Sequence, residues 1–400
     1  MVPAAQILQA MKGMKTLRSG RNRRKWIYVL LLMGLLGLSG CGSPSSASVE
    51  MSSQTELVKT GSMELQYAEN FAVDYYEDGY KMLTTLPDSK RYLIVPEGQP
   101  VPRGLDEDVS ILQEPLQNIY LVASGVMDMF ASVDAVDQIR FSGQKQENWY
   151  IQTAKDAMAA GDMIYAGKYS KPDYELLVSE GCDLAIENRM ITHSPEVVEM
   201  LQGFDIPVMI EYSSYEQHPL GKVEWVKFFG ALTGKEAEAE EAFAEQTEIL
   251  EEVESGEKTG KTIAFFYVTS NGLIQVRQST DYIPKLIELA GGRYIFEDLE
   301  DSGSGRSTLN MQVEDFYAGA KDADILIYNS SIDGGVTTLD ELIGKCNILK
   351  DFKALQEGQV YCTTNDMYQQ SMAIGYLLQD MHTVLTDDDT AKLRYLFLLQ

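Results

Sequence analysis

The chain has 400 residues, which is long enough for two domains of ordinary size. Its formal net charge of −27 argues against nucleic-acid binding and against docking on anionic lipid, because both functions need basic surface patches. With 4 cysteines and 3 histidines, we expect neither a disulfide framework nor a His-rich metal site, while the redox state of Cys182, Cys346 and Cys362 stays open.

Residues 1–40 follow the pattern of a removed secretory segment. Basic residues between positions 18 and 25 precede the apolar run Trp26–Leu38, which is too short for a comfortable membrane span. The run closes on Leu38-Ser-Gly-Cys41, which resembles the bacterial lipobox. The resemblance implies that Cys41 carries a lipid anchor and begins the mature protein on the extracytoplasmic face of the cell membrane.

Two features of this leader leave alternatives open. An uncleaved signal anchor with an incidental cysteine also fits the pattern, but the serine-rich stretch 42–53 favours cleavage and a flexible tether, placed at 41–63. The true start is equally compatible with Met1, Met11 or Met14.

Beyond the tether, residues 64–232 are predicted to form a first α/β lobe. The tyrosine-rich segment Leu65–Thr85 is expected to form a pair of edge strands. Further strands are predicted at 92–95, 119–123, 139–141, 183–186 and 207–210, and helices at 126–136, 147–160 and 195–202. Strands that alternate with helices favour a parallel sheet covered on both faces, with Cys182 buried beside its strand.

The same pattern restarts after residue 256 and predicts a second α/β lobe over 257–400. Strands are expected at 262–268, 324–328 and 360–361, and helices at 281–289, 313–320, 339–343, 351–355 and 372–385.

One long helix is predicted between the lobes, at 233–256. Thr233 and Glu236 have the spacing of a capping box, and neither Pro nor Gly interrupts the chain from Glu236 to Ser255. Apolar residues recur on one face, and the helix would be about 33 Å long at the standard rise. A single bridging helix would limit hinge motion; the alternative is an ordinary helix that packs on a sheet.

Three segments then resemble the ABC-transporter substrate-binding proteins that capture iron–siderophores, haem, cobalamin or metals. They are Ile186-Glu-Asn-Arg-Met-Ile191, His193-Ser-Pro-Glu196 and the stretch 213–227, in which His218-Pro-Leu-Gly-Lys-Val-Glu-Trp-Val-Lys227 is similar to the "PLGRxEWIK" segment of cobalamin- and iron-type members. The chain differs in carrying Lys222 where Arg is usual. The resemblance implies two Rossmann-like lobes with mostly parallel sheets, one bridging helix and a ligand cleft between the lobes.

The resemblance also implies two permease-docking residues. In the family, an exposed glutamate on each lobe pairs with arginines of the permease, and it lies on a short helix that precedes an Asp-led strand. Glu175 and Glu314 match this position, and both lobes repeat the order Glu, helix, Asp, strand. A carboxylate at a helix start would bind Arg in bidentate fashion, although it would also complement the helix dipole without any partner.

In open α/β sheets, ligands bind at the loops that follow the carboxyl ends of strands. Polar and aromatic residues in these loops are therefore the candidate ligand-binding residues. They are Trp149, Tyr150, Glu187, Asn188, Arg189, His193, Glu211 and Tyr215 in the first lobe, and Arg277, Asn329 and Tyr368 in the second.

Several of these candidates have a second interpretation. Trp149 with Tyr150 would form an aromatic wall or pack a helix on the sheet. Glu187, His193, Glu211 and His218 would supply N and O ligands to a metal ion, or His218 would only cap or pack at the start of a helix. Arg277 suits an anionic ligand group or a structural salt bridge. Whether any metal is ligated directly stays open.

The leading hypothesis is a monomeric, lipid-anchored receptor that delivers a ferric siderophore, haem or cobalamin to an ABC permease and its ATPase. A receptor for a free metal ion and a surface sensor or adhesin with the same fold are the alternatives. The sequence has no phosphate-binding glycine loop, no G-x-S-x-G elbow and no His-Glu-x-x-His motif, so we expect no enzymatic activity and no intrinsic cofactor.

Overall fold

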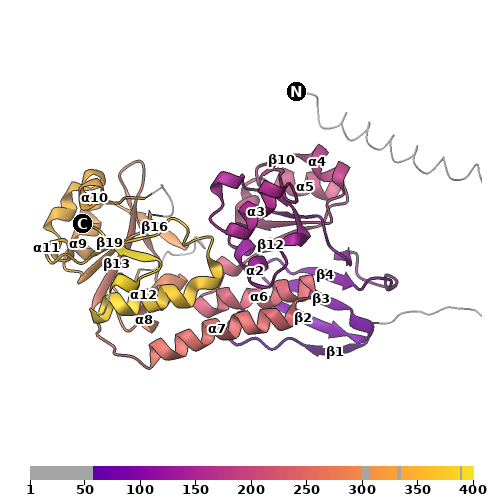
Figure 1. Ribbon diagram of the computed structural model, residues 1–400, viewed down its shortest axis with the longest axis horizontal. Helices are drawn as coiled ribbons and strands as arrows, with labels where there is room; N and C mark the ends of the chain where they lie inside the picture. Colours follow the sequence, from indigo (N-terminus) through magenta and orange to yellow (C-terminus); the bar gives the residue numbers. More distant parts are fainter. Residues whose placement is uncertain (1–56, 300–306, 331–334, 388–389) are drawn as a thin grey trace, which may run out of the picture. The chain divides into compact units, whose positions relative to one another are not determined.

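The computed structural model describes residues 57–299, 307–330, 335–387 and 390–400 (Figure 1). The predicted leader, Cys41 and most of the tether lie outside these ranges. The described residues belong to a single compact unit that spans residues 54–400.

The chain first forms a five-stranded sheet that the sequence did not predict as a separate layer. Its strands lie in the order β1 to β5, with β4 and β5 parallel and the others antiparallel. They are β1 (Lys59–Ser62), β2 (Phe71–Tyr76), β3 (Lys81–Thr85), β4 (Lys90–Val95) and β5 (Val109–Gln113).

Three expectations for this region are corrected. β2 and β3 are interior strands rather than edge strands, and β1 lies within the range predicted as tether. The predicted strand at 92–95 belongs to this first sheet instead of the parallel sheet. The physical reason is that alternate side chains here are covered on both faces, with Phe71 and Val73 in the main core and Tyr80 and Met82 in a separate cluster under a loop.

The second sheet is the parallel sheet predicted for the first lobe. Its order is β12-β11-β6-β7-β8, and all four pairings are parallel. Its strands are β6 (Ile119–Leu121), β7 (Ile139–Ser142), β8 (Ile164–Tyr165), β11 (Leu184–Asn188) and β12 (Val208–Glu211). The helices α2 (Val126–Ser132) and α3 (Gln152–Ala160) share one core with one face, and α4 (Tyr174–Glu180) and α5 (Pro195–Gly203) share another core with the opposite face.

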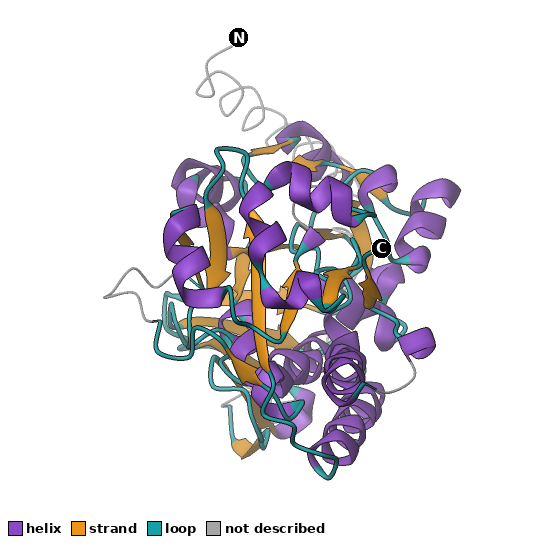
Figure 2. Ribbon diagram, turned by 90° about the vertical axis from the view of Figure 1, so that its left-hand side faces the viewer, coloured by secondary structure: helices purple, strands orange, loops and turns teal. Residues whose placement is uncertain are grey.

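The third sheet forms the second lobe and is mixed. The parallel strands β13 (Thr262–Val268), β17 (Ile325–Tyr328) and β18 (Val360–Thr363) were predicted. Antiparallel β14 (Ile274–Arg277), β16 (Thr308–Met311) and β19 (Leu396–Leu398) extend it on both sides and were missed, and β15 (Arg293–Tyr294) pairs with β13. Figure 2 shows the helices lying around the strands.

The helices of this lobe confirm the predicted positions. They are α8 (Tyr282–Leu289), α9 (Val313–Ala320), α10 (Leu339–Lys345), α11 (Lys353–Gln356) and α12 (Ile374–Thr386). Cys182, Cys346 and Cys362 are buried, and no disulfide joins them. In the described ranges, no helix is both long enough and apolar enough to cross a membrane.

The bridging helix is confirmed as α7 (Glu236–Glu254), which packs against α6 (Pro219–Thr233) and α12 (Figure 1). Its buried stripe includes Phe243 and Leu250. The predicted capping box is wrong, because α6 itself extends to Thr233, whose hydroxyl donates to the carbonyl of Phe229 at 2.7 Å. Gly234 then turns the chain in the left-handed region, with φ of 73°.

Helix α6 is buried along almost its whole length and carries the motif that resembles "PLGRxEWIK". Its Glu224 carboxylate accepts hydrogen bonds from the backbone N–H groups of Gln66, Tyr67 and Ala68 at 2.8–3.1 Å. Trp225 packs edge-on against Phe71 with ring centroids 4.9 Å apart. This part of the motif therefore holds the first sheet on the rest of the unit.

Candidate ligand site and docking residues

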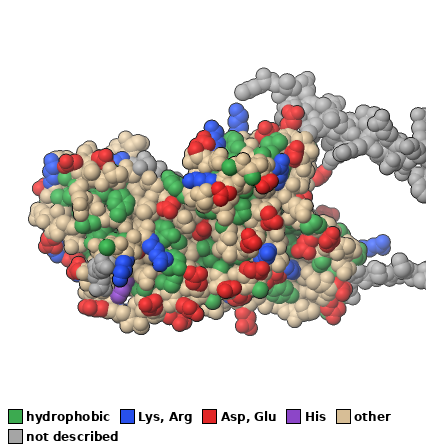
Figure 3. All heavy atoms as spheres, in the orientation of Figure 1, with side chains coloured by type: hydrophobic (Ala, Val, Ile, Leu, Met, Phe, Trp, Pro, Cys, Tyr) green, Lys and Arg blue, Asp and Glu red, His purple; other side chains and the backbone are tan. Residues whose placement is uncertain are grey.

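The carboxyl ends of the two α/β sheets meet at a junction held by side-chain hydrogen bonds. The side-chain amide of Gln369, in the loop after β18, donates to the carbonyl of Asn148 and accepts from the N–H of Tyr150, both at 2.8 Å. The carboxylate of Asp128 accepts from the N–H of Met372 at 2.7 Å. Figure 3 shows the surface indented between the lobes and acidic side chains scattered over the visible face.

Four exposed apolar side chains mark this edge of the first lobe, and we call them the Tyr–Met platform. Tyr215 follows β12, Met190 follows β11, Tyr150 follows β7, and Tyr165 ends β8. They are 38–49% exposed and make up four of the seven exposed large hydrophobic residues in the described ranges. Because parallel strands lie about 4.8 Å apart, a sheet of this order spans about 19 Å. What the four residues share is their position at the carboxyl ends of parallel strands, which is where ligands bind in open α/β sheets.

Two platform residues, Tyr150 and Tyr215, were predicted from the sequence, whereas Tyr165 and Met190 were missed. Tyr165 and Met190 could have been identified as candidates because they lie at or just after the end of a strand. Arg189 lies against the platform, with its guanidinium carbon 4.4 Å from the centre of the Tyr215 ring. Asn188 accepts from the N–H of Met190 at 2.9 Å and so caps the short helix that ends at His193, whose side chain is exposed.

Trp149 is not part of this surface, in contrast to the prediction of an aromatic wall. Its side chain is 1% exposed, and its indole N–H donates to the hydroxyl of Ser142 at 3.1 Å. For this residue the alternative of core packing is confirmed, because the loop after β7 folds back over the sheet.

The proposed constellation of metal ligands does not assemble. In the part of the chain that the structure describes, no three His, Cys, Asp or Glu side chains are close enough to hold a metal ion. His218 accepts from the N–H of Leu220 at 3.2 Å and stacks on Tyr67 with ring centroids 4.4 Å apart. Glu211 accepts from the N–H and hydroxyl of Ser213 at 2.8 and 2.6 Å, and burial raises the pKa of its carboxyl.

The candidates of the second lobe form one buried polar cluster. The Arg277 guanidinium contacts the hydroxyl of Tyr368 and the carboxylate of Asp281, the latter at 3.3 Å. The side-chain amide of Asn329 donates to the same Tyr368 hydroxyl at 2.6 Å. Arg277 is only 8% exposed and is paired with Asp281, which agrees with the interpretation of this residue as part of a structural salt bridge.

Glu187 is the penultimate residue of β11, and its side chain is fully buried. Its two carboxylate oxygens have no hydrogen-bond partner among the described residues, and burial raises its pKa from 4.5 to about 9. The folded chain therefore keeps this carboxyl protonated at neutral pH, whereas the unfolded chain ionises it above pH 4.5.

This difference predicts a pH-dependent stability. Since the folded pKa is raised, the stability is fully present below pH 4.5 and decreases as the pH rises toward about 9. Glu187→Gln should remove most of this decrease and raise the free energy of unfolding at pH 8 by on the order of 2–4 kcal/mol. Urea unfolding at pH 5 and pH 8 measures the effect. An equal decrease in both proteins would contradict the assignment.

The two predicted docking glutamates occupy equivalent positions in the two lobes. Glu175 is the second residue of α4, Glu314 is the second residue of α9, and both side chains are exposed. Each helix is followed by an interior strand of its sheet, β11 and β17 respectively, and both strands have parallel neighbours on each side.

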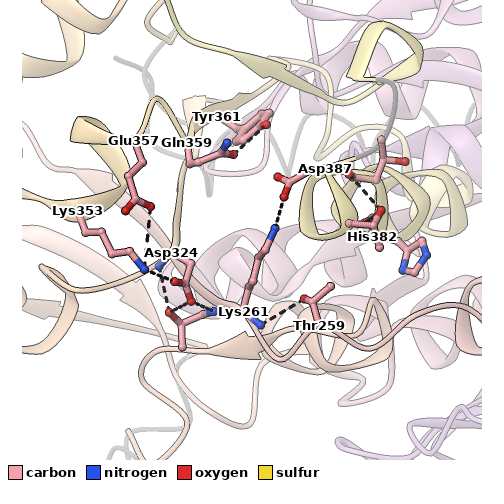
Figure 4. Close-up of polar contacts among 12 residues, drawn as sticks. Thr259, Lys261, Asp324, Lys353, Glu357, Gln359, Tyr361, His382 and Asp387 are labelled. Atoms are coloured by element: carbon pink, nitrogen blue, oxygen red, sulfur yellow. Dashed lines mark hydrogen bonds and ion pairs between the residues drawn. The ribbon is translucent and has the colours of Figure 1, made fainter.

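The aspartate before each of these strands has the same role in both lobes. Asp183 accepts from the N–H groups of Gln117 and Asn118 at 3.0 and 2.9 Å. Asp324 accepts from the N–H of Thr262 at 2.7 Å and from Lys353 at 2.6 Å (Figure 4). Each aspartate thus ties the start of its strand to the neighbouring strand, which gives a structural reason for the aspartate in the repeated order of Glu, helix, Asp and strand.

Comparisons with known proteins agree with this architecture. No protein-family model matches the chain. An uncharacterized lipoprotein of Methanocaldococcus jannaschii is 24% identical over 401 residues, which cover 90% of this chain and 92% of the relative. A second uncharacterized lipoprotein of the same organism is 23% identical over 367 residues, which cover 86% and 90%.

Solved structures match the fold at low sequence identity. A possible iron-binding (periplasmic solute-binding) protein from Staphylococcus epidermidis has a TM-score of 0.53 at 16% identity, covering 67% of this chain and 98% of its own. The periplasmic haem-binding protein HutB of Vibrio cholerae has a TM-score of 0.53 at 14% identity, with the same coverage of 67% and 98%. The chain therefore has the fold of the periplasmic binding proteins for iron complexes and haem.

Proposed function

We propose that this protein is a non-enzymatic receptor of an ABC importer, which captures a bulky metal chelate or corrinoid outside the membrane and delivers it to the permease. The observation that carries the proposal is the Tyr–Met platform at the carboxyl ends of the first lobe's strands. A hydrated ion would gain no binding energy from four exposed apolar side chains. A ring-containing ligand would cover them, and its binding free energy would improve by about 25 cal/mol for each Å² of apolar surface buried.

The metal chelates named for similar folds supply the candidate ligands. One solved structure of similar fold is the haem-binding HutB, and another, with a TM-score of 0.51 at 15% identity and coverage of 68% of this chain, is described as an ABC-type Fe3+-hydroxamate transport system from Saccharomonospora viridis. Haem and a ferric siderophore are therefore ligands to test, together with cobalamin, which the sequence resemblance implies, and a free metal ion as the contrasting case.

Delivery would use Glu175 and Glu314 as the permease contacts, with Cys41 as the lipid anchor. Two relatives from Methanocaldococcus jannaschii are named as lipoproteins, which supports the proposed lipid anchor. An anchored receptor stays near its permease, which raises its effective concentration there.

The ligand can be identified on purified protein by absorption and mass spectra, followed by titration with a ferric siderophore, haemin, cyanocobalamin and a free metal ion. We expect one of the three bulky ligands to bind. The double variant Tyr150→Ala, Tyr215→Ala should bind that ligand with an affinity lower by about 10-fold or more, because each aromatic ring contributes on the order of 1 kcal/mol to the binding free energy.

Val101→Ala is the matched control for the platform variant. Val101 is also 48% exposed, but it lies in the loop between β4 and β5, away from the strand ends. Its removal should leave the affinity unchanged. Binding of only the free ion, or equal affinities of the platform variant and the control, would reject the proposed ligand class.

A further inference from the structure

Helix α6 buries three charged side chains, and two of them contact a partner of opposite charge. Lys227 forms ion pairs with Glu240 at 2.9 Å and Glu224 at 3.5 Å. Lys222 is 6% exposed, and within the described part of the chain its ammonium group contacts only the ring of Tyr282, at 4.9 Å from the centroid. Lys222 is therefore the buried charge of this helix that has no hydrogen-bonded counter-ion.

Lys222 lies where the two lobes meet. The charged and phenolic groups that act on its ionisation are Glu211 from the first lobe and Arg277, Asp281 and Tyr368 from the second. Burial lowers the pKa of the Lys222 ammonium, and Glu211 opposes this change. Its ammonium group thus lies against Tyr282 of the second lobe and close to the polar cluster of Arg277, Asp281 and Tyr368.

The two nearby carboxylates are already engaged with other donors. Glu211 binds the N–H and the hydroxyl of Ser213. Asp281 accepts from the N–H of Ile283 at 3.0 Å, where it caps α8, and it pairs with Arg277. Neither carboxylate supplies Lys222 with a hydrogen bond.

Buried hydroxyl groups at the same junction also lack a partner. The hydroxyls of Ser371 and Thr364, in the segment after β18, make no hydrogen bond within the described ranges. Ser371 begins a short helix that packs against α6, and its hydroxyl lies so close to Gly125 that a Cβ there would be only 2.7 Å away. The loops and helices at the junction thus contain an ammonium without a hydrogen-bonded counter-ion and two hydroxyls without hydrogen-bond partners. The ammonium can only donate, so the group that would complement it is a hydrogen-bond acceptor that carries negative charge.

We propose that Lys222 is a ligand-binding residue whose ammonium group takes an oxyanion, such as a carboxylate, of the captured molecule. The proposal rests on the receptor function above and narrows its ligand to one with an apolar body for the platform and an anionic group for the junction. Covering most of a lysine side chain while its ammonium has no acceptor is unfavourable, and an apolar side chain would avoid that cost. An anionic ligand would supply the missing counter-charge.

The affinity test titrates the full chain with five probes. Quenching of tryptophan fluorescence reports the binding of each probe. Haemin and ferric enterobactin carry anionic groups, whereas haemin dimethyl ester, ferrichrome and cyanocobalamin lack a free oxyanion of the carboxylate or catecholate kind. We expect an anionic probe to bind best, and Lys222→Met to weaken it by about 30-fold or more. Lys222→Arg should retain most of the affinity, because it keeps the charge.

A second measurement separates a ligand-binding role from a structural one. In the absence of ligand, Lys222→Met should unfold at a temperature equal to or above that of the unaltered chain, because it removes an unpaired buried charge. The matched control is Lys227→Met on the same helix, which removes a paired charge. This control should unfold at a lower temperature and keep the preference for anionic probes.

Each contrary outcome is informative. A lower unfolding temperature for Lys222→Met, or an unchanged affinity for the anionic probe, would overturn the role of Lys222. Equal or better binding of a neutral probe would overturn it too, while leaving the receptor function intact. A failure to bind any of the five probes would count against both proposals.

Discussion

Cells that carry the double variant Glu175→Ala, Glu314→Ala should lose uptake of the ligand, while the purified variant binds that ligand with unchanged affinity. The two carboxylates lie at the second position of α4 and α9, on exposed helix starts that the two lobes repeat. Each would form a bidentate, charge-assisted pair with an arginine of the permease, so losing both should reduce uptake by at least about 30-fold. Uptake of radiolabelled ligand and a binding titration measure the two quantities.

The control must separate docking from a simple effect on the helix dipole. Glu196 and Asp340 are also exposed and also occupy the second position of their helices, α5 and α10. The variant Glu196→Ala, Asp340→Ala should therefore lose the same dipole stabilisation, about 0.3–1 kcal/mol at each site, and keep full uptake. Equal uptake by the two double variants, or lost ligand affinity in the first, would refute the docking assignment.

Glu224→Leu should produce the largest loss of stability, about 3–5 kcal/mol in the free energy of unfolding. The Glu224 side chain is fully buried and accepts hydrogen bonds from three consecutive backbone N–H groups, those of Gln66, Tyr67 and Ala68. Leucine would leave these donors buried without an acceptor and would remove one partner of Lys227. Urea unfolding, followed by circular dichroism, gives the change.

Hydrogen exchange locates the effect. Because Glu224 joins the segment before β2 to α6, the amides of β2 and β3 should lose protection before those of β13 and β17 in the second lobe. Glu248→Gln is the matched control, since Glu248 is an exposed carboxylate on the neighbouring helix α7. If Glu224→Leu and Glu248→Gln unfold at the same urea concentration, the hydrogen bonds between Glu224 and residues 66–68 do not contribute to stability.

Much of the fold was readable from local patterns. Helix α9 and strand β13 have the predicted bounds, and the bridging helix α7 lies within the predicted range. These segments have strong periodicity and clear end signals, such as Gly291 after α8. The strands β14, β16 and β19 were missed because they are short antiparallel additions to the sheet and do not follow the alternation of strand and helix on which the prediction relied.

The candidate site was less predictable, because its residues act through neighbours that are distant in the sequence. Trp149 and Tyr150 are adjacent, yet the first is 1% exposed and the second is 48% exposed. Nothing local distinguishes them, because the difference arises from Gln369 and the sheet beneath the loop. The lack of a hydrogen-bonded counter-ion at Lys222 likewise could not be predicted from the sequence, since the side chain contacts Tyr282 on a helix of the other lobe.

Local sequence patterns were sufficient to predict the alternation of strands and helices, the two α/β lobes with their bridging helix, and the repeated order of Glu, helix, Asp and strand. Those features depend on periodicity and on backbone preferences within a few residues. The three-dimensional packing was needed to learn which strand-end residues are exposed, that Glu187, His193, Glu211 and His218 do not form a metal site, and that Lys222 of α6 lacks a hydrogen-bonded counter-ion. Burial and pairing depend on which elements pack over a side chain, and that packing joins segments far apart in the chain.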